Sequence, residues 1–232
     1  MSITTKNIEV AGRAISIETG RVAEQANGAV VIRQGDSVVL STVVMSKEPR
    51  EGIDFFPLTC DYEEKLYAAG KIPGAFMRRE GRPSETAILA SRLTDRPLRP
   101  LFPDGFRLDI QVVSTVLSVD QENDPTILSI NGASTAIVIS DVPWAGPVGA
   151  VRMGLLDGQV VVNPPMSRMA ESELDLSFED VERIRVLPVD MRVRAFFAGL
   201  IAKPRHDQLL EVAEDPQRPL GAIGGRLALA GS

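Results

Sequence analysis

The residues best suited to chemistry lie in a glycine- and proline-rich stretch, residues 67–85, where Phe76 is followed closely by Arg78 and Arg79. Guanidinium groups bind phosphate oxygens through paired hydrogen bonds, and an aromatic ring offers a stacking surface that suits any base. The combination therefore indicates binding of single-stranded nucleic acid. The alternative interpretation is a solvated loop whose arginines pair with neighbouring glutamates, as exposed charges commonly do.

Charge is unevenly distributed along the 232 residues. The net charge is −6, which by itself argues weakly against a nucleic-acid partner. Residues 71–107 nevertheless contain eight basic and four acidic side chains, so this segment carries a net charge of +4. A concentrated basic segment is what an anionic ligand requires. The candidate RNA-binding residues are Phe76, Arg78, Arg79, Arg82, Arg92 and Arg96.

Arg92 and Arg96 lie four positions apart, on one face of a predicted helix, where they could extend the basic surface. Carboxylates such as Asp95 could equally hold them in structural ion pairs. We favour that structural role for Arg96 and Arg99, because each is flanked by a proline.

Composition excludes several other kinds of site. His206 is the single histidine and Cys60 the single cysteine, which are too few for a typical zinc site. One cysteine also excludes an internal disulfide and fits a reducing cytoplasm. No apolar run is long enough to span a membrane, and the N-terminus lacks a signal-peptide pattern. We assign no catalytic residue and no metal ligand, because the carboxylates Glu173 and Asp175 are more typical of a solvated surface.

The elements that must position these side chains begin with β structure. Apolar runs over most of the first 61 residues predict strands, among them a hairpin that turns at residues 34–36 and a strand at 55–60. Residues 62–83 lose this periodicity and contain five glycines and prolines, so we expect one long loop. Such a loop inside a compact domain is usually functional or disordered.

A helix should follow the loop. Ser84 is a suitable N-cap, and the helix should end near Asp95 because Pro97 disfavours helical geometry in the residue before it. The residues expected to face the core are Ile88, Leu89 and Leu93.

The remaining pattern consists of a strand at 108–119, a second helix at 126–140 and a hairpin at 148–162. The second helix is apolar all round and rich in small residues, so it should be buried in close contact with a sheet. Strands and helices come in blocks, which favours an α+β layer fold with a mixed sheet.

Residues 71–102 closely resemble the first core domain of the polynucleotide phosphorylase (polyribonucleotide nucleotidyltransferase) family. The resemblance is carried by Glu-Gly-Arg-Pro-Ser-Glu at 80–85 and Asp-Arg-Pro-Leu-Arg-Pro-Leu-Phe at 95–102, and it extends over most of residues 8–176. It implies a ribonuclease PH-like fold, with residues 1–176 forming the first core domain.

The resemblance also implies phosphate-dependent 3′-to-5′ degradation of RNA, with Mg²⁺ as the cofactor of the full-length family enzyme. Single-stranded RNA is the implied partner, together with a homotrimeric ring that RNA threads and with other RNA-degradation factors. In the family, the loop matching residues 76–79 lines the channel constriction and usually carries a second aromatic residue. Met77 takes that place here, so weaker stacking is expected.

In the same family, phosphorolysis belongs to the second core domain, where a serine-rich turn binds phosphate. The matching turn here, residues 120–125, has three carboxylates and no hydroxyl group, so it should repel phosphate. Two interpretations remain, an enzyme chain that is phosphorolytic only within a complete protein and a non-catalytic RNA-binding module from a truncated or frameshifted chain. The missing phosphate turn argues against a third, a complete single-domain ribonuclease PH-type enzyme.

The resemblance stops abruptly after Leu176. Residues 177–232 are therefore interpreted as a divergent C-terminal tail of uncertain structure, produced by a shifted reading frame or by a lineage-specific segment with a strand at 181–187. The first origin predicts ready proteolysis beyond about residue 176.

Overall fold

The computed structural model of the chain describes residues 3–74, 76 and 78–180. The expectations for Met77, for His206 and for a strand at 181–187 lie outside these residues. The first domain was expected to end at Leu176, and a strand described below, β9, spans that position.

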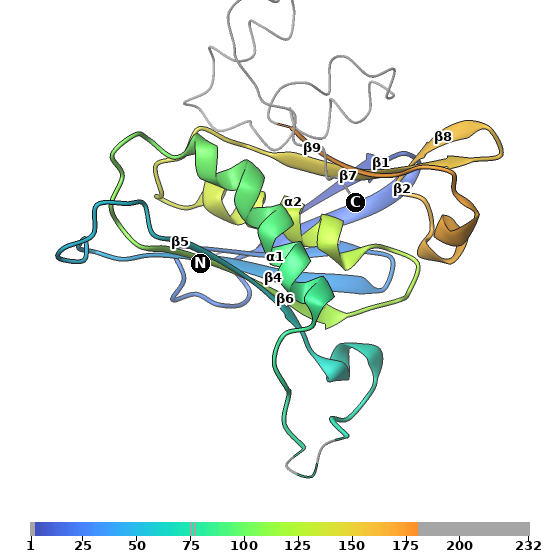
Figure 1. Cartoon of the computed structure of the whole chain (residues 1–232), viewed down its shortest axis with the longest axis horizontal. Helices are drawn as coiled ribbons and strands as arrows, with labels where there is room; N and C mark the ends of the chain where they lie inside the picture. Colours follow the sequence, from blue (N-terminus) through green and yellow to red (C-terminus); the bar gives the residue numbers. More distant parts are fainter. Residues whose placement is uncertain (1–2, 75, 77, 181–232) are drawn as a thin grey trace, which may run out of the picture. The chain divides into compact units, whose positions relative to one another are not determined.

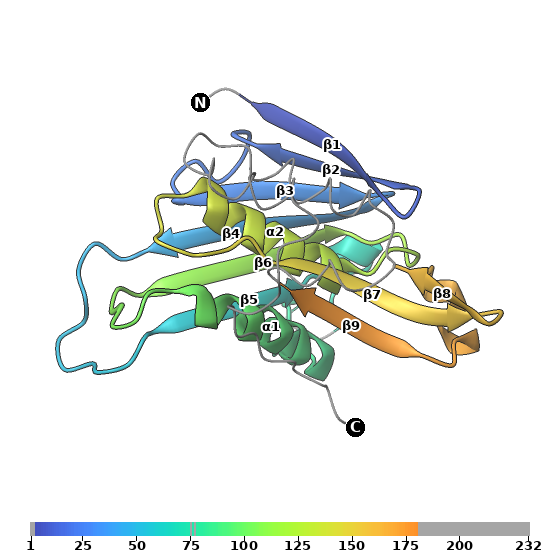
Figure 2. The ribbon, with the colours of Figure 1, turned by 90° about the horizontal axis from the view of Figure 1, so that it is seen from above.

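A six-stranded mixed sheet forms the base of the fold. Its order is β1-β2-β3-β4-β6-β5, and all neighbours are antiparallel except β5 and β6, which are parallel. Figure 2 shows the strands side by side in this order. The strands are β1 (Thr4–Val10), β2 (Arg13–Thr19), β3 (Gly28–Gln34), β4 (Ser37–Met45), β5 (Leu58–Glu64) and β6 (Ile110–Ser118). The predicted mixed sheet and the hairpin turn at residues 34–36 are confirmed.

Two helices, α1 (Glu85–Leu98) and α2 (Pro125–Ile139), cover one face of this sheet, and a second sheet of three strands lies beyond α2 (Figure 1). That sheet has the order β8-β7-β9 and is antiparallel throughout. Its strands are β7 (Gly149–Leu156), β8 (Gln159–Val162) and β9 (Asp175–Asp180). Three short 3₁₀ turns complete the described elements: η1 (Leu66–Ala69), η2 (Arg99–Leu101) and η3 (Met166–Glu171).

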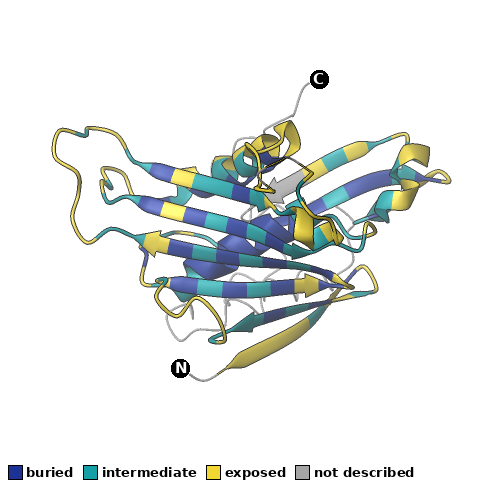
Figure 3. Cartoon of the chain, turned by 90° about the horizontal axis from the view of Figure 1, so that it is seen from below, coloured by how far each residue is buried: buried dark blue, intermediate teal, exposed yellow. Residues whose placement is uncertain are grey.

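Helix α2 is buried between the two sheets, as its apolar composition predicts. Every residue from Ile127 to Ile137 is buried. Small side chains allow the close approach, since a Cβ atom at Gly132 would lie 2.6 Å from Oγ of Ser41 on β4. A Cβ atom at Gly28 on β3 would overlap the carbonyl oxygen of Ala136. The core therefore forms around α2, and the opposite face of the six-stranded sheet is only partly exposed, with buried and intermediate residues alternating along the strands (Figure 3).

Two expectations for α1 are wrong. The helix continues to Leu98 and includes Pro97, because a proline in the last turn removes only one backbone N–H and Arg99 N–H still reaches the carbonyl oxygen of Asp95. The expected core face is also displaced, since Ile88 is 45% and Leu89 61% exposed, while Leu93 packs partly buried against the core. The buried residues of α1 are Ala87, Ala90, Thr94 and Leu98.

The strand expected at 55–60 begins later, at Leu58, and runs to Glu64 as the parallel edge strand β5. Its extension shortens the loop expected at 62–83. Phe56 does not belong to the strand but joins an aromatic cluster with Phe102 and Phe106, whose ring centroids lie 4.7 and 5.5 Å from that of Phe56.

Candidate functional site

The loop between β5 and α1 extends away from the sheet and is held at its base (Figure 1). The backbone N–H of Leu66 donates to the Glu80 carboxylate at 3.0 Å, and the Ser84 hydroxyl donates to Glu64 at 2.8 Å. Val119 N–H, at the end of β6, donates to the carbonyl oxygen of Ala68 at 3.1 Å. These contacts fix both ends of the loop, so the residues at its tip are presented to solvent from a rigid base.

The tip carries the aromatic and basic residues singled out from the sequence. Phe76 is 100% exposed, which is unusual for a phenylalanine and leaves both faces of its ring free for a ligand. Arg78, Arg79 and Arg82 are also exposed. Among the described residues, none of these three guanidiniums makes an ion pair or a hydrogen bond, and the nearby Glu80 is used by a backbone N–H. The alternative of a loop whose arginines pair with glutamates therefore finds no support in the geometry.

Arg92 and Arg96 lie on the exposed face of α1, opposite its buried residues. Asp95, the expected partner of Arg96, is used by Arg99 instead, in an ion pair of 2.6 Å. The structural role we favoured for two arginines is thus confirmed for Arg99 and wrong for Arg96. Like Arg92, Arg96 has no charged or hydrogen-bonded partner in the described part of the chain.

Arg99 locks the start of β5 to the end of α1. Besides pairing with Asp95, its guanidinium donates to the carbonyl oxygens of Phe56 and Leu58 at 3.3 and 3.0 Å. Four of its five N–H donors are used in this way, which leaves little capacity for an external phosphate. We call the exposed set, Phe76, Arg78, Arg79, Arg82, Arg92 and Arg96, the basic surface.

Cys60 is not placed to act as a nucleophile. Burial raises the pKa of its thiol, and the nearby Asp95 carboxylate raises that pKa further. The thiol donates to Asp95 at 3.9 Å. A protonated, largely buried thiol is a structural side chain, because the thiolate is the reactive form.

The acidic turn before α2 is filled by one of its own carboxylates. Asp120 accepts hydrogen bonds from the backbone N–H groups of Asp36, Glu122 and Asn123, from the Ser37 hydroxyl and from the Asn123 side-chain amide, at 2.6 to 3.0 Å. Burial alone would raise the pKa of Asp120, but these donors outweigh it and hold the pKa well below its usual range. The backbone N–H groups of Glu122 and Asn123 are therefore occupied, and the carboxylate would repel phosphate.

The carboxylate of Asp175 is also occupied. The Arg152 guanidinium donates to both its oxygens, at 2.8 and 2.7 Å, and holds the pKa of Asp175 below its usual range. Arg152 also donates to the carboxylate of Asp124, the N-cap of α2, at 2.7 Å. Within residues 3–74, 76 and 78–180, no three carboxylate, thiol or imidazole side chains converge to hold a metal ion. The described residues around Asp175 and the turn therefore do not form a magnesium site.

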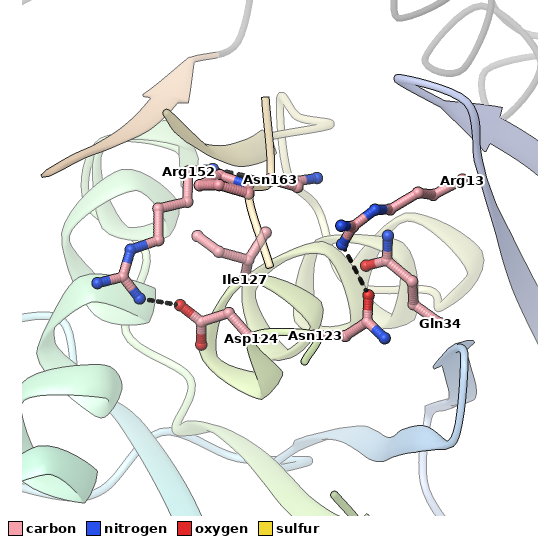
Figure 4. Close-up of a pocket in the computed structure, with 8 residues that line it drawn as sticks. Arg13, Gln34, Asn123, Asp124, Ile127, Arg152 and Asn163 are labelled. Atoms are coloured by element: carbon pink, nitrogen blue, oxygen red, sulfur yellow. Dashed lines mark hydrogen bonds and ion pairs between the residues drawn. The ribbon is translucent and has the colours of Figure 1, made fainter. Parts of the chain in front are cut away.

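A small pocket lies at the N-terminus of α2 (Figure 4). It shares no residue with the basic surface. Sequence reasoning did not find it, because its side chains come from β2, β3, the turn before α2, α2 itself, β7 and the segment after β8. Residue spacing gives no signal for such a set. The lining residues are Arg13, Gln34, Asn123, Asp124, Ile127, Arg152, Asn163 and Pro164.

In the part of the chain that the structure describes, no helix is both long and apolar enough to cross a membrane.

Comparison with known proteins finds relatives of one kind, which all concern exoribonucleases. The model of the 3′ exoribonuclease family, domain 1, matches residues 11–143. A polyribonucleotide nucleotidyltransferase of Thermomicrobium roseum is 66% identical over 174 residues, which cover 75% of this chain and 22% of that protein. One from Roseiflexus sp. (strain RS-1) is 60% identical over 232 residues, covering 97% of this chain and 30% of that protein. That alignment extends into the segment interpreted above as divergent.

The chain thus spans between about a fifth and a third of the length of the curated relatives it matches. Among solved structures, rice Rrp46 is similar with a TM-score of 0.59 and 15% identity, over 83% of this chain and 92% of that one. A chain of the Archaeoglobus fulgidus exosome, solved with RNA bound to the active site, has a TM-score of 0.54 and 15% identity, over 90% of this chain and 89% of that one. At this identity the likeness establishes the fold alone, a ribonuclease PH-like one.

Proposed function

The chain belongs to the 3′ exoribonuclease family, and on that premise we propose that it is the N-terminal core domain of a polyribonucleotide nucleotidyltransferase. The complete enzyme degrades RNA from its 3′ end with phosphate, and this domain contributes RNA binding and ring assembly. A homotrimeric ring in the cytoplasm is the arrangement that the family resemblance supports.

The observation that supports the RNA-binding role is that the basic surface is exposed and its arginines are unpaired. Five exposed arginines lack an ionic partner among the described residues, and the aromatic ring of Phe76 is fully exposed. Guanidiniums without a carboxylate partner have no ion pair to break when they bind phosphate, whereas paired ones must first give one up. The ring at Phe76 adds a stacking surface that does not discriminate between bases.

Phosphorolysis and Mg²⁺ binding are assigned to other parts of the complete enzyme. In the turn at residues 120–125 Asp120 binds the backbone N–H groups of Glu122 and Asn123, and Asp175 has both oxygens bound by Arg152. Neither group is available for phosphate or a metal. A non-catalytic RNA-binding module remains the second candidate, favoured by the same two occupied carboxylates.

Replacing Arg78 and Arg79 together with alanine is expected to weaken binding of single-stranded oligoadenylate by about tenfold or more, because two charge-assisted contacts are lost. The plot of log K against log salt should become shallower by about 1.4, since two fewer counterion sites are released. Fluorescence anisotropy at several salt concentrations measures both.

The matched control replaces Arg21 and Arg33 with alanine. Both are exposed and paired with local carboxylates, Glu18 and Asp36, so the net charge changes equally while the basic surface stays intact. An equal loss of slope in both double variants would reduce the effect to net charge and remove Arg78 and Arg79 from the RNA path.

The purified chain is expected to release no nucleoside diphosphates from RNA in the presence of phosphate and Mg²⁺, because the Asp120 carboxylate occupies two backbone donors of the acidic turn and repels phosphate. Chromatography of the products against a phosphate-free reaction measures the release. Robust phosphate-dependent release would contradict the assignment of phosphorolysis to the rest of the enzyme.

A further inference from the structure

We propose that Asn27 is a site of spontaneous deamidation, and that its neutral amide holds together the junction of β3, β4 and α2. The inference does not rest on the proposed RNA-binding role, because Asn27 lies outside the basic surface. Asn27 is followed by Gly28. In an Asn-Gly pair the next backbone nitrogen reaches the side-chain carbonyl carbon most easily, since glycine has no Cβ atom in the way.

The chain contains two Asn-Gly pairs, and they lie in different surroundings. Asn131 is 4% exposed inside α2, where both ends of its carboxamide are hydrogen-bonded to the backbone of Ala150 at 2.9 Å. Gly132 follows within the same helix, so its nitrogen belongs to the helical hydrogen-bond ladder. Asn27 is exposed, and Gly28 is the first residue of β3, where a strand frays most easily. Asn131 is therefore protected, whereas Asn27 is open to attack.

One contact at Asn27 favours the reaction. Its Oδ1 accepts a hydrogen bond of 2.9 Å from the backbone N–H of Met45, at the end of β4. When the deprotonated nitrogen of Gly28 attacks Cγ of Asn27, negative charge develops on Oδ1, where this donor already lies. A bond forms between that nitrogen and Cγ, the bond from Cγ to Nδ2 breaks, and Nδ2 takes a proton from water and leaves as ammonia. Water then opens the cyclic imide at either carbonyl, which gives aspartate or isoaspartate at position 27.

The neighbouring carboxylate of Asp141 makes the aspartate product unfavourable. Nδ2 of Asn27 donates to Oδ1 of Asp141 at 3.0 Å, so the amide joins the start of β3 to the segment after α2. In the ranges that the structure describes, Asp141 forms no ion pair with a lysine or arginine. Deamidation replaces the donor with a carboxylate oxygen, and like charges this close repel each other even in water. The contact is therefore lost.

The packing of Gly28 makes the isoaspartate product unfavourable. A Cβ atom at Gly28 would overlap the carbonyl oxygen of Ala136 and would lie 3.1 Å from Cβ of Ser140, so the start of β3 lies directly against the end of α2. Isoaspartate lengthens the backbone by one carbon before residue 28, which must displace Gly28 or break its pairing with Val43. Both products therefore loosen the same junction.

Peptide mass spectrometry of the full chain, aged at mildly alkaline pH, tests the site. We expect the mass gain of an amide-to-acid conversion to accumulate at Asn27 in the folded chain and to remain absent from Asn131. Chain kept unfolded in guanidinium chloride should gain it at both positions, because unfolding removes the protection of Asn131. Equal conversion at both positions in the folded chain, or conversion at neither, would overturn the assignment.

Two variants test the role of the amide. Asn27→Asp should lower the midpoint of unfolding by about 0.5 M urea, because the contact becomes repulsive. Adding Asp141→Asn should restore most of this loss, since the pair again has one donor and one acceptor with their roles exchanged. Asp141→Asn alone should change little, because two amides still form the hydrogen bond.

The double variant also keeps the test decisive. An unchanged midpoint for Asn27→Asp, or a loss that Asp141→Asn does not relieve, would overturn the proposed role of the amide. If Asn27→Asp does not fold, a folded double variant supports the proposal and an unfolded one overturns it.

Discussion

Replacing Arg152 with methionine is expected to lower the free energy of unfolding by about 3 kcal/mol, which denaturant titration of the purified chain would measure. Arg152 joins the N-cap of α2 to β9 by contacts of 2.7 Å to both Asp124 and Asp175. The side chains of Arg152 and Asp124 are 19% and 16% exposed, so removing the guanidinium leaves a carboxylate poorly hydrated and unpaired. Methionine keeps much of the length of the side chain and so limits the loss of packing.

Arg168 provides the matched control, because it also lies between two carboxylates, Asp157 and Glu171, each at 3.0 Å. Its side chain is 44% exposed and those of its partners 82% and 61%, so solvent screens these pairs. Arg168→Met should therefore cost much less stability than Arg152→Met, because solvent screens an exposed ion pair. Equal losses at Arg152 and Arg168 would contradict the view that burial decides the difference.

A double variant separates charge from packing at the same position. Asn is as good an N-cap residue as Asp, so Asp124→Asn keeps the cap of α2 and removes the charge that Arg152 neutralises. Adding it to Arg152→Met should cost less than the sum of the two single changes, by about 1 kcal/mol or more. Strict additivity would indicate that Arg152 acts through packing alone.

Replacing Asp120 with alanine is expected to lower the free energy of unfolding by about 2 to 3 kcal/mol, since donors on Asp36, Ser37, Glu122 and Asn123 lose their shared acceptor. Asp120→Asn should cost less, because it retains one oxygen. Asp36→Ala is the control, as that side chain is 82% exposed and forms an exposed ion pair with Arg33. Denaturant titration of the three variants gives the comparison.

The contribution of Asp120 should also depend on pH in a defined direction. Folding lowers the pKa of Asp120, so its stabilising contribution is complete above the unfolded pKa of about 3.9 and declines as the pH falls below that value. The stability difference between the unmodified chain and Asp120→Asn should therefore be constant near neutrality and shrink in acid. A difference that grows in acid would contradict the role of the carboxylate as the acceptor.

The sequence by itself determined the main elements and the character of the basic surface. Short apolar runs on either side of a turn-rich link predicted the hairpin of β3 and β4, and an apolar segment rich in small residues predicted the buried α2. Both patterns are local, because they depend on which face of one element meets the core. The glycine- and proline-rich loop with Phe76, Arg78 and Arg79 was also found from local composition, and its proposed contact with RNA stays a prediction.

Only the tertiary structure decided which charges are paired and which face of α1 is buried. Asp95 lies next to Arg96 in the chain, yet it binds Arg99, because the approach of β5 directs that guanidinium toward Phe56 and Leu58. Helix α1 buries Ala87 and Ala90 and exposes Ile88 and Leu89. Which face of the helix is buried depends on how closely α1 packs on β5. The Asp120 turn and the Arg13 pocket join residues more than eighty positions apart. Partnership at such separation follows from packing and strand order, which no local pattern in the sequence encodes.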